Sequence, residues 1–282
     1  MTRPVLLTLG HGYSAEALAA SLGPGWRRIG TTRTATRAAE MRAAGVEAID
    51  WGDAAAVDAA IADASHVLVS LPPDAAGDAA FARHGPALQS RGPEWLGYLS
   101  TTGVYGDRDG AWVEEDAPLA PVNDRSRWRV AAERSWLDSG LAAEVFRLAG
   151  IYGPGRSAFD RLRDGRAQRV VKPGQVFSRI HVEDIAGVLA ASIARPEACA
   201  VWNVADDEPA PPQDVIAFAA ALLGMPAPPE VPFETADLSP MARSFYAESK
   251  RVANRRIRER LGVTLRHPDY RAGLRAILAQ GE

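Results

Sequence analysis

The 282-residue sequence contains a single cysteine, no long apolar run and no strong excess of either charge. Cys199 cannot form a disulfide within the chain, and no group of cysteines and histidines has zinc-ligand spacing, so we expect no metal centre. The apolar runs fall far short of the roughly 18 residues that a membrane span needs. A net charge of -3 argues against a nucleic-acid partner.

These absences leave a globular protein with a small-molecule partner. The segment "MTRPVLLTLGHG" enters a strand at once and lacks a signal-peptide pattern, so we expect a cytoplasmic protein. The sequence leaves open whether the protein is a monomer or a homodimer.

Short apolar runs alternate with helical patterns through the first two-thirds of the chain. We predict strands at 5–10, 26–33, 46–51 and 66–73, a fifth strand within 95–106 and a sixth strand with a loop at 142–153. Helices are predicted at 14–22, 54–64 and 128–140, with another ending at Gly45. Strands that alternate with helices form parallel sheets covered on both faces. The sequence therefore predicts an α/β fold, with a Rossmann-type doubly wound parallel sheet.

The alternation changes after Gly153. We predict a helix starting near Val182, a strand at 201–207, a helix at 212–224, a loop at 226–232 and a polar helix at 249–262. We expect residues 1–153, with a contribution from about 178–205, to form an NAD(P)-binding Rossmann domain. Residues 154–177 and 206–282 would then form a smaller substrate domain.

A glycine-rich turn follows the first predicted strand. In "LLTLGHGYSAEAL", Gly10, Gly12 and Ala15 form a G-x-G-x-x-A array between a strand and a helix. The first glycine permits the turn, the second lets a pyrophosphate approach the backbone, and the small third residue permits close helix packing. We predict dinucleotide binding here, and a purely structural turn is the alternative.

The end of the second strand discriminates between the two nicotinamide cofactors. An acid there binds the ribose 2′-hydroxyl of NAD, whereas an arginine accommodates the 2′-phosphate of NADP. The stretch "IGTTRTATR" contains Thr31, Thr32 and Arg33 but no acid, which favours NADP over NAD. Arg33 could instead be a solvated surface residue. Asp50 and Asp53 could contact the adenine or lie free in loops.

Four segments together resemble a known family: "GHGYSA", "STTGVYGD" (100–107), "FRLAGIYGPG" (146–155) and "RIHVEDIAG" (179–187). Their order is similar to that in extended short-chain dehydrogenase/reductases, which include the NAD-dependent epimerases and dehydratases. The likeness covers nearly the whole chain and is greatest to the atypical, YeeZ-like branch. It implies a Rossmann domain, a small C-terminal substrate domain and a site whose usual catalytic residues are often missing.

The family's catalytic residues are a Ser or Thr after the fifth strand and a Tyr-x-x-x-Lys pair on the next helix. The resemblance assigns Thr101 to the first role. It aligns Arg125 with the tyrosine and Arg129 with the lysine. Arginine stays protonated, so Arg125 cannot cycle as a general acid, while Arg129 could still hold a ribose or be a surface charge.

Tyr246 and Lys250 repeat the Tyr-x-x-x-Lys spacing far along the chain, in the predicted substrate domain. On a helix these two side chains would be neighbours for packing reasons alone. We interpret the pair as a coincidence, and a relocated proton donor as the alternative.

Each of the other candidate residues near predicted strand ends has two possible roles. Tyr105 and Tyr152 could act in catalysis or pack as core aromatics. His181 with Asp184 could move a proton or support a helix start, and Arg147 could anchor a loop or contact an anionic substrate.

The predicted catalytic residues are Thr101 and Tyr105. The predicted cofactor site comprises Gly10, Gly12, Tyr13, Ala15, Thr32, Arg33, Asp50, Leu71, Pro72, Ser100 and Arg129. These residues predict an NADP-dependent oxidoreductase or epimerase-like enzyme for a small carbonyl, hydroxyl or sugar-nucleotide substrate. A non-catalytic NADP-binding sensor or regulatory protein is the alternative.

Overall fold

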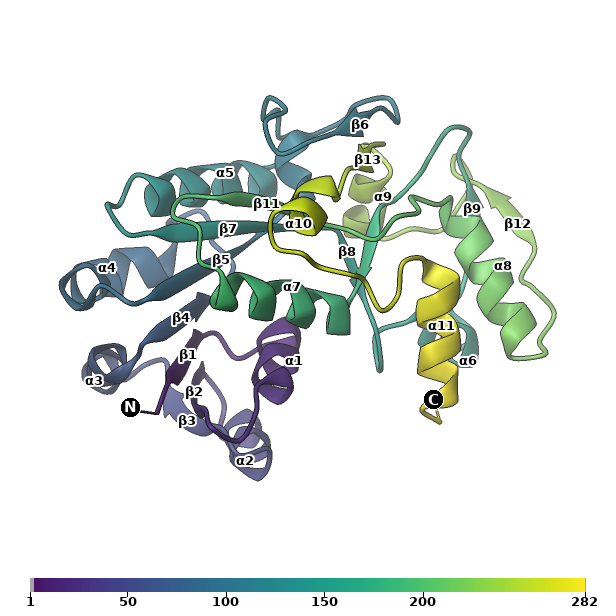
Figure 1. The fold of residues 1–282 in the computed structure, drawn as a ribbon. Helices are drawn as coiled ribbons and strands as arrows, with labels where there is room; N and C mark the ends of the chain where they lie inside the picture. The colour runs from purple at the N-terminus through teal and green to yellow at the C-terminus, as the bar shows by residue number, and fades with distance from the viewer. Residues whose placement is uncertain (1–2, 282) are drawn as a thin grey trace.

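The computed structural model describes residues 3–281. A seven-stranded parallel sheet dominates it (Figure 1). In spatial order the strands are β11 (Val201–Val204), β7 (Ala143–Leu148), β5 (Trp95–Thr101), β4 (His66–Val69), β1 (Val5–Leu9), β2 (Arg27–Thr32) and β3 (Glu47–Asp50). The chain progresses outward in opposite directions from β1, so the predicted doubly wound Rossmann-type sheet is confirmed.

Helices cover both faces of the sheet, so successive strand residues are buried on opposite sides. One apolar cluster lies between the sheet and α1 (Tyr13–Ser21), α2 (Ala35–Ala43) and α7 (Val182–Ala194). The other lies beneath α3 (Ala54–Asp63), α4 (Ala79–Arg91) and α5 (Asp124–Leu137). Leu6 belongs to the first cluster and Leu7 to the second, which explains the continuous apolar run in β1.

A smaller part of the chain packs beside the sheet, at the right of Figure 1. There α6 (Ala158–Arg163), α8 (Pro212–Leu222) and α11 (Tyr270–Ala279) share an apolar cluster that includes Phe159, Ile216 and Leu274. Strand β9 (Arg169–Val171) pairs with β12 (Glu230–Pro232), and β8 (Gly150–Tyr152) with β10 (Arg179–His181). The boundaries of the two predicted domains stay a prediction.

Three segments differ from the sequence-based expectation. The polar helix predicted at 249–262 is instead β13 (Arg251–Val252), which pairs with β6 (Trp112–Val113), followed by the short α10 (Arg255–Glu259). The loop predicted at 226–232 contains β12, because its backbone pairs with β9. The pattern gave no helix at α4, whose interior contains Gly85 and Pro86.

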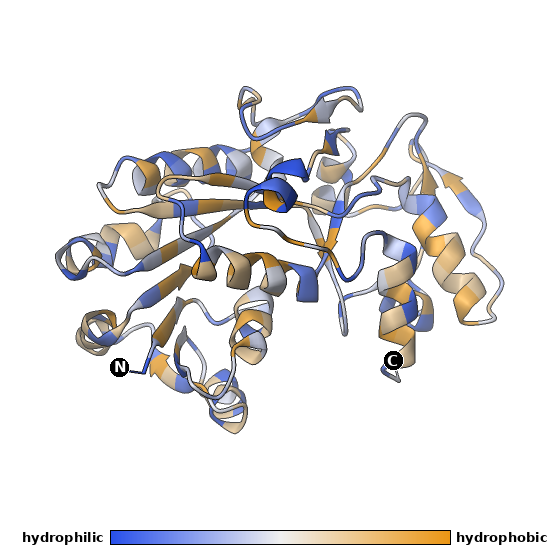
Figure 2. Ribbon diagram, in the orientation of Figure 1, coloured by the Kyte–Doolittle hydropathy of each residue, from blue (hydrophilic) through white to orange (hydrophobic). Residues whose placement is uncertain are grey.

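The distribution of apolar residues agrees with this layered packing. Figure 2 shows apolar and polar residues alternating around the helices, as expected when one face of each helix is buried. Among residues 3–281, no helix combines the length and the apolar character needed to cross a membrane.

Candidate functional site

The glycine turn joins β1 to α1, as predicted. Gly10 has a φ of +88°, and its N–H donates to Thr31 Oγ1 at 2.7 Å. A Cβ at Gly10 would lie 2.9 Å from the side chain of Leu71. Gly10 is therefore required by its own backbone conformation and by the close approach of Leu71.

Gly12 differs, because the protein itself does not require a glycine there. Its backbone is extended, with a φ of -94°, and a Cβ placed there would meet no protein atom within 4 Å. It is also the N-cap of α1 and has no side chain to cap the helix N–H groups. Ala15 is fully buried in the cluster between α1 and the sheet. An open space above an uncapped helix N-terminus fits a dinucleotide pyrophosphate.

His11 and Arg37 support this turn, although the sequence analysis did not single them out. His11 Nδ1 lies 2.8 Å from Thr8 Oγ1, and burial together with the Arg37 guanidinium lowers the His11 pKa to about 4. Arg37 pairs with Glu16 at 2.6 Å and Glu40 at 2.9 Å. The ring of His11 is therefore neutral near pH 7 and helps to fix the turn.

Three predicted residues lie together where β2 and β3 end. Thr32 is the register partner of Asp50, and Arg33 follows directly. Asp50 Oδ1 accepts the Gly52 N–H at 3.0 Å. Arg33 is exposed, and within residues 3–281 it makes no hydrogen bond or ion pair. Asp53, the other candidate for the adenine, caps α3 by accepting the Ala56 N–H at 3.0 Å.

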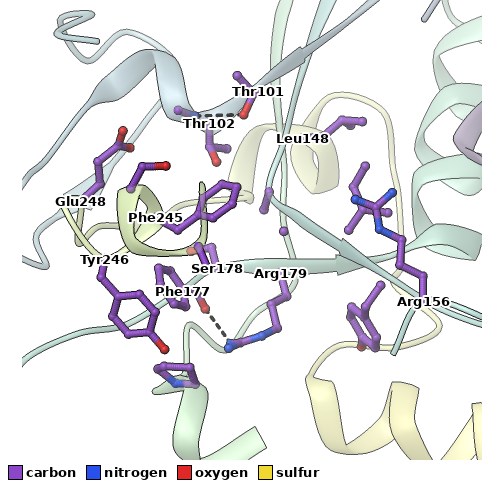
Figure 3. Close-up of a pocket in the computed structure, with 18 of the residues that line it drawn as sticks. Thr101, Thr102, Leu148, Arg156, Phe177, Ser178, Arg179, Phe245, Tyr246 and Glu248 are labelled. Atoms are coloured by element: carbon purple, nitrogen blue, oxygen red, sulfur yellow. Dashed lines mark hydrogen bonds between the residues drawn. The ribbon is translucent and has the colours of Figure 1, made fainter. Parts of the chain in front are cut away.

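A cavity of about 1170 Å³ lies at the carboxyl ends of the central strands (Figure 3). Of the predicted site residues, the following line it: Tyr13, Pro72, Ser100, Thr101 and Arg129. Residues of the smaller part of the chain, including Phe177 and Arg179, form the opposite wall. A cavity at this edge of a parallel sheet is where ligands of such folds bind.

Thr101 ends β5 and is half-buried on the cavity wall. Its Oγ1 accepts the Gly103 N–H at 3.1 Å, which caps the short 3-10 helix η1 (Thr102–Tyr105). The hydroxyl proton is not used by that contact and can be donated to a ligand. Ser100 differs, because its buried hydroxyl donates to the Glu133 carboxylate.

The structure does not support Tyr105 as a catalytic residue. Tyr105 is fully buried and does not line the cavity. Its hydroxyl donates to Asn203 Oδ1 at 2.6 Å and accepts from Arg147 at 2.9 Å, and burial raises its pKa to about 12. Arg147 also pairs with buried Glu133 at 2.8 Å, so it anchors this network rather than contacting a substrate.

The two arginines of α5 at the family's Tyr and Lys positions both reach the cavity. Arg129 donates to the Leu99 carbonyl and, at 3.2 Å, to the Tyr98 hydroxyl, so it is no free surface charge. Arg125 donates to Ser244 Oγ at 3.2 Å and lies over the Phe245 ring at 5.8 Å. Arg125 thus links α5 to α9 (Pro240–Phe245) across the cavity.

Tyr246 and Lys250 are not on one helix, because α9 ends at Phe245. Lys250 donates to the Gly106 carbonyl at 2.8 Å and pairs with Glu248 at 2.5 Å. Tyr246 is only 8% exposed and stacks on Phe233. Burial raises its pKa.

Tyr246 does line the same cavity as Thr101. Figure 3 shows the two residues on different sides of it, with Phe245 between them and the Tyr246 hydroxyl directed away from Thr101. This arrangement favours the interpretation of the Tyr-x-x-x-Lys spacing as a coincidence.

The segment around β10 has a supporting role. Asp184 accepts the backbone N–H groups of Arg266 at 2.7 Å and His267 at 3.0 Å, which attaches the chain before α11 to the start of α7. His181 is buried outside the cavity, so it is not placed to move a proton there. Tyr152 lines the cavity and donates to the Asp269 carbonyl at 3.3 Å.

Two solved structures resemble this chain over nearly its whole length. A conserved protein of unknown function from Silicibacter pomeroyi DSS is 55% identical, with a TM-score of 0.93 and 99% of each chain covered. A dTDP-glucose 4,6-dehydratase from Bacillus anthracis str. Ames, solved in complex with NAD, is 14% identical, with a TM-score of 0.80 over 98% of this chain and 96% of its own.

Two curated proteins are related in sequence. A 3-diazoavenalumate denitrifying reductase from Streptomyces sp is 32% identical over 182 residues, or 57% of this chain and 58% of that protein. Protein YeeZ from Escherichia coli (strain K12) is 29% identical over 238 residues, or 78% of this chain and 84% of its own. No protein-family profile matches the chain.

The fold and the glycine turn define the class: this chain has the extended short-chain dehydrogenase/reductase fold of NAD-dependent epimerases and dehydratases. Within that class it is a homologue of Protein YeeZ.

Proposed function

We propose that the protein is an NAD(P)-dependent oxidoreductase or epimerase-like enzyme that acts on a small carbonyl, hydroxyl or sugar-nucleotide compound. The main support is the space above Gly12, which no protein atom fills at an uncapped helix N-terminus. The adjoining cavity at the strand ends has room for a nicotinamide and a substrate together.

We further propose that NADP is preferred. Arg33 is exposed, unpaired within the described residues, and adjacent to Thr32 and Asp50 at the end of β2. An unpaired guanidinium suits the 2′-phosphate that only NADP carries. The structurally similar dTDP-glucose 4,6-dehydratase was solved with NAD, so NAD is the alternative cofactor.

In this proposal the bound nicotinamide supplies or accepts a hydride. The Thr101 hydroxyl donates a hydrogen bond to the reacting oxygen of the substrate, and Arg129 holds the end of β5 in place through the Leu99 carbonyl. Arg125 cannot move a proton, because its guanidinium stays charged. When a carbonyl is reduced, its oxygen would therefore take a proton from water, and when a hydroxyl is oxidised, its proton would go to water.

The alternative is a non-catalytic NADP-binding sensor. It is favoured by Arg125, which occupies the family's tyrosine position and binds Ser244 instead of offering a titratable hydroxyl. It is also compatible with Tyr105, whose hydroxyl is fully engaged in the core.

Turnover of a panel of carbonyl compounds and sugar nucleotides with NADPH, and of hydroxyl compounds with NADP⁺, distinguishes the two proposals. We expect Thr101→Val to lower turnover by about 10²-fold or more, the usual effect of losing a positioned catalytic hydrogen bond. Thr101→Ser keeps the hydroxyl and should retain most of the rate, as should Tyr246→Phe. Tight NADPH binding without transfer to any compound would favour the sensor.

A further inference from the structure

Three potential metal ligands lie together where the chain before α11 meets the start of α7. They are His181, Glu183 and His267, and their nearest ligand atoms all lie within 4.8 Å of one another. The rings of His181 and His267 have centroids 4.0 Å apart, and His267 Nε2 lies 3.0 Å from Glu183 Oε2. His267 is 86 positions from His181, so no spacing motif could reveal this cluster.

One ring nitrogen of His181 has no hydrogen-bond partner in the part of the chain that the structure describes. His181 is completely buried, and its Nε2 makes no hydrogen bond with the described residues. Its Nδ1 accepts the Glu183 N–H at the rather long distance of 3.3 Å. An unpartnered buried polar atom is costly, and native structures usually give such an atom a hydrogen-bond partner, a water or an ion.

We propose that His181, Glu183 and His267 bind a divalent transition-metal ion of the zinc type. Two imidazoles and one carboxylate suit zinc, cobalt or nickel, whereas magnesium and calcium prefer oxygen ligands. His267 Nε2 and Glu183 Oε2 are joined by a hydrogen bond of 3.0 Å, and the cation would replace the proton of that bond. Glu183 is partly exposed, so the ion has an entry path and a water can complete the coordination.

The ligand geometry requires only small adjustments. Tetrahedral zinc with bonds of about 2.0–2.1 Å places ligand atoms roughly 3.3 Å apart, so side-chain shifts on the order of 1 Å suffice. Coordination through His181 Nε2 leaves the ring proton on Nδ1, and the long contact with the Glu183 N–H is given up. Asp184 already fixes the backbone of His267 and so holds the two sides together.

The site would join distant parts of the chain. His181 ends β10, Glu183 lies in the first turn of α7, and His267 precedes α11, the last helix. A metal ion here would attach α11 and its apolar cluster to the helix that packs on the main sheet. Its role is therefore structural, and it does not depend on the proposed enzymatic function.

Cobalt titration of the metal-free, tag-free protein tests this proposal. We expect one Co²⁺ per chain, with the visible absorption of a four-coordinate site, displacement of Co²⁺ by Zn²⁺, and a higher unfolding midpoint with Zn²⁺. His267→Gln and Glu183→Gln should each weaken binding by about 100-fold or more, because loss even of groups that only orient ligands costs 10–100-fold. His66→Gln, a histidine outside the cluster, should bind as the unchanged protein does.

If His267→Gln does not fold, Glu183→Gln still tests the proposal. Glu183 is partly exposed, so its substitution should leave the fold intact. The proposal would be overturned by a folded protein that neither absorbs with Co²⁺ nor gains stability with Zn²⁺. Equal affinity in the unchanged protein and in folded Glu183→Gln would likewise show that the ion binds elsewhere.

Discussion

At the residue scale, two arginines that lie close together in the sequence differ in their ionic partners. Arg33 and Arg37 lie four positions apart, just after β2 and in α2. Arg37 is engaged with Glu16 and Glu40, whereas Arg33 has no ionic partner among residues 3–281. An arginine already neutralised by two acids offers less to an incoming phosphate, so Arg33 is the better candidate.

Cofactor choice tests this assignment. Arg33→Ala should weaken the binding of NADPH by roughly 1.5–3 kcal/mol, or about one to two decades in affinity, and should leave the binding of NADH nearly unchanged. Arg42→Ala, another exposed arginine on α2, is the control and should change neither affinity. Calorimetric titration measures both cofactors, and equal losses for NADPH and NADH would remove Arg33 from this role.

The sequence located some candidate residues well and others poorly, for a physical reason. The positions of Gly10, Gly12 and Thr101 could be predicted because they follow from local chain geometry between adjacent elements; their roles stay predictions. Tyr105 could not, because its burial depends on Arg147 and on Asn203, which is 98 positions away. Whether a hydroxyl at a strand end is available to a ligand depends on the distant residues that bury it.

At the element scale, the edge of the sheet contains a buried acid that the sequence pattern did not reveal. Glu144 of β7 is fully buried and accepts from Trp202 of β11 at 2.6 Å and from Ser192 of α7 at 2.8 Å. It also accepts the backbone N–H of Glu197 at 3.0 Å. This side chain therefore joins two strands and a helix through one carboxyl group.

Burial raises the pKa of Glu144 to about 7, although its hydrogen bonds oppose the shift. The folded state then holds the proton more tightly than the unfolded state, so stability falls as pH rises from the ordinary carboxyl range through about 7. We expect the unfolding midpoint to fall between about pH 5 and pH 8, and to fall less in Glu144→Gln. Glu94→Gln, which changes an exposed acid, should show the same fall as the unchanged protein. Parallel plots of unfolding midpoint against pH for all three proteins would contradict the prediction.

Most elements of the alternating region were predictable because their strands contain short apolar runs and their helices are bounded by turn residues, although α4 was missed. The C-terminal elements were less so. Strand β13 has only two residues and exists because β6, about 140 positions earlier, offers a paired edge. Such short strands are determined by tertiary partners rather than by their own sequence.

At the scale of the whole molecule, the cavity is built by segments from both parts of the chain. Arg125 contacts Ser244, and Lys250 contacts the Gly106 carbonyl. The last quarter of the chain is therefore attached to segments at the carboxyl ends of the main strands. The sequence predicted a parallel sheet with a dinucleotide site and a smaller substrate domain. It could not predict the opposite wall, whose residues come together only through these long-range contacts.

The central claim is that the space above Gly12 binds a nicotinamide dinucleotide, and one calorimetric titration tests it directly. NADPH and NADH are titrated into the unchanged protein and into Gly12→Val. Because a Cβ at Gly12 meets no protein atom within 4 Å, we expect the variant to fold with a nearly unchanged unfolding midpoint. Gly10→Ala is the contrast, since its φ of +88° and the nearby Leu71 should make it less stable.

We expect the unchanged protein to bind NADPH in a one-to-one complex, and more tightly than NADH, and folded Gly12→Val to bind neither. Undiminished NADPH affinity in folded Gly12→Val, or no binding of either cofactor to the unchanged protein, would contradict the central claim.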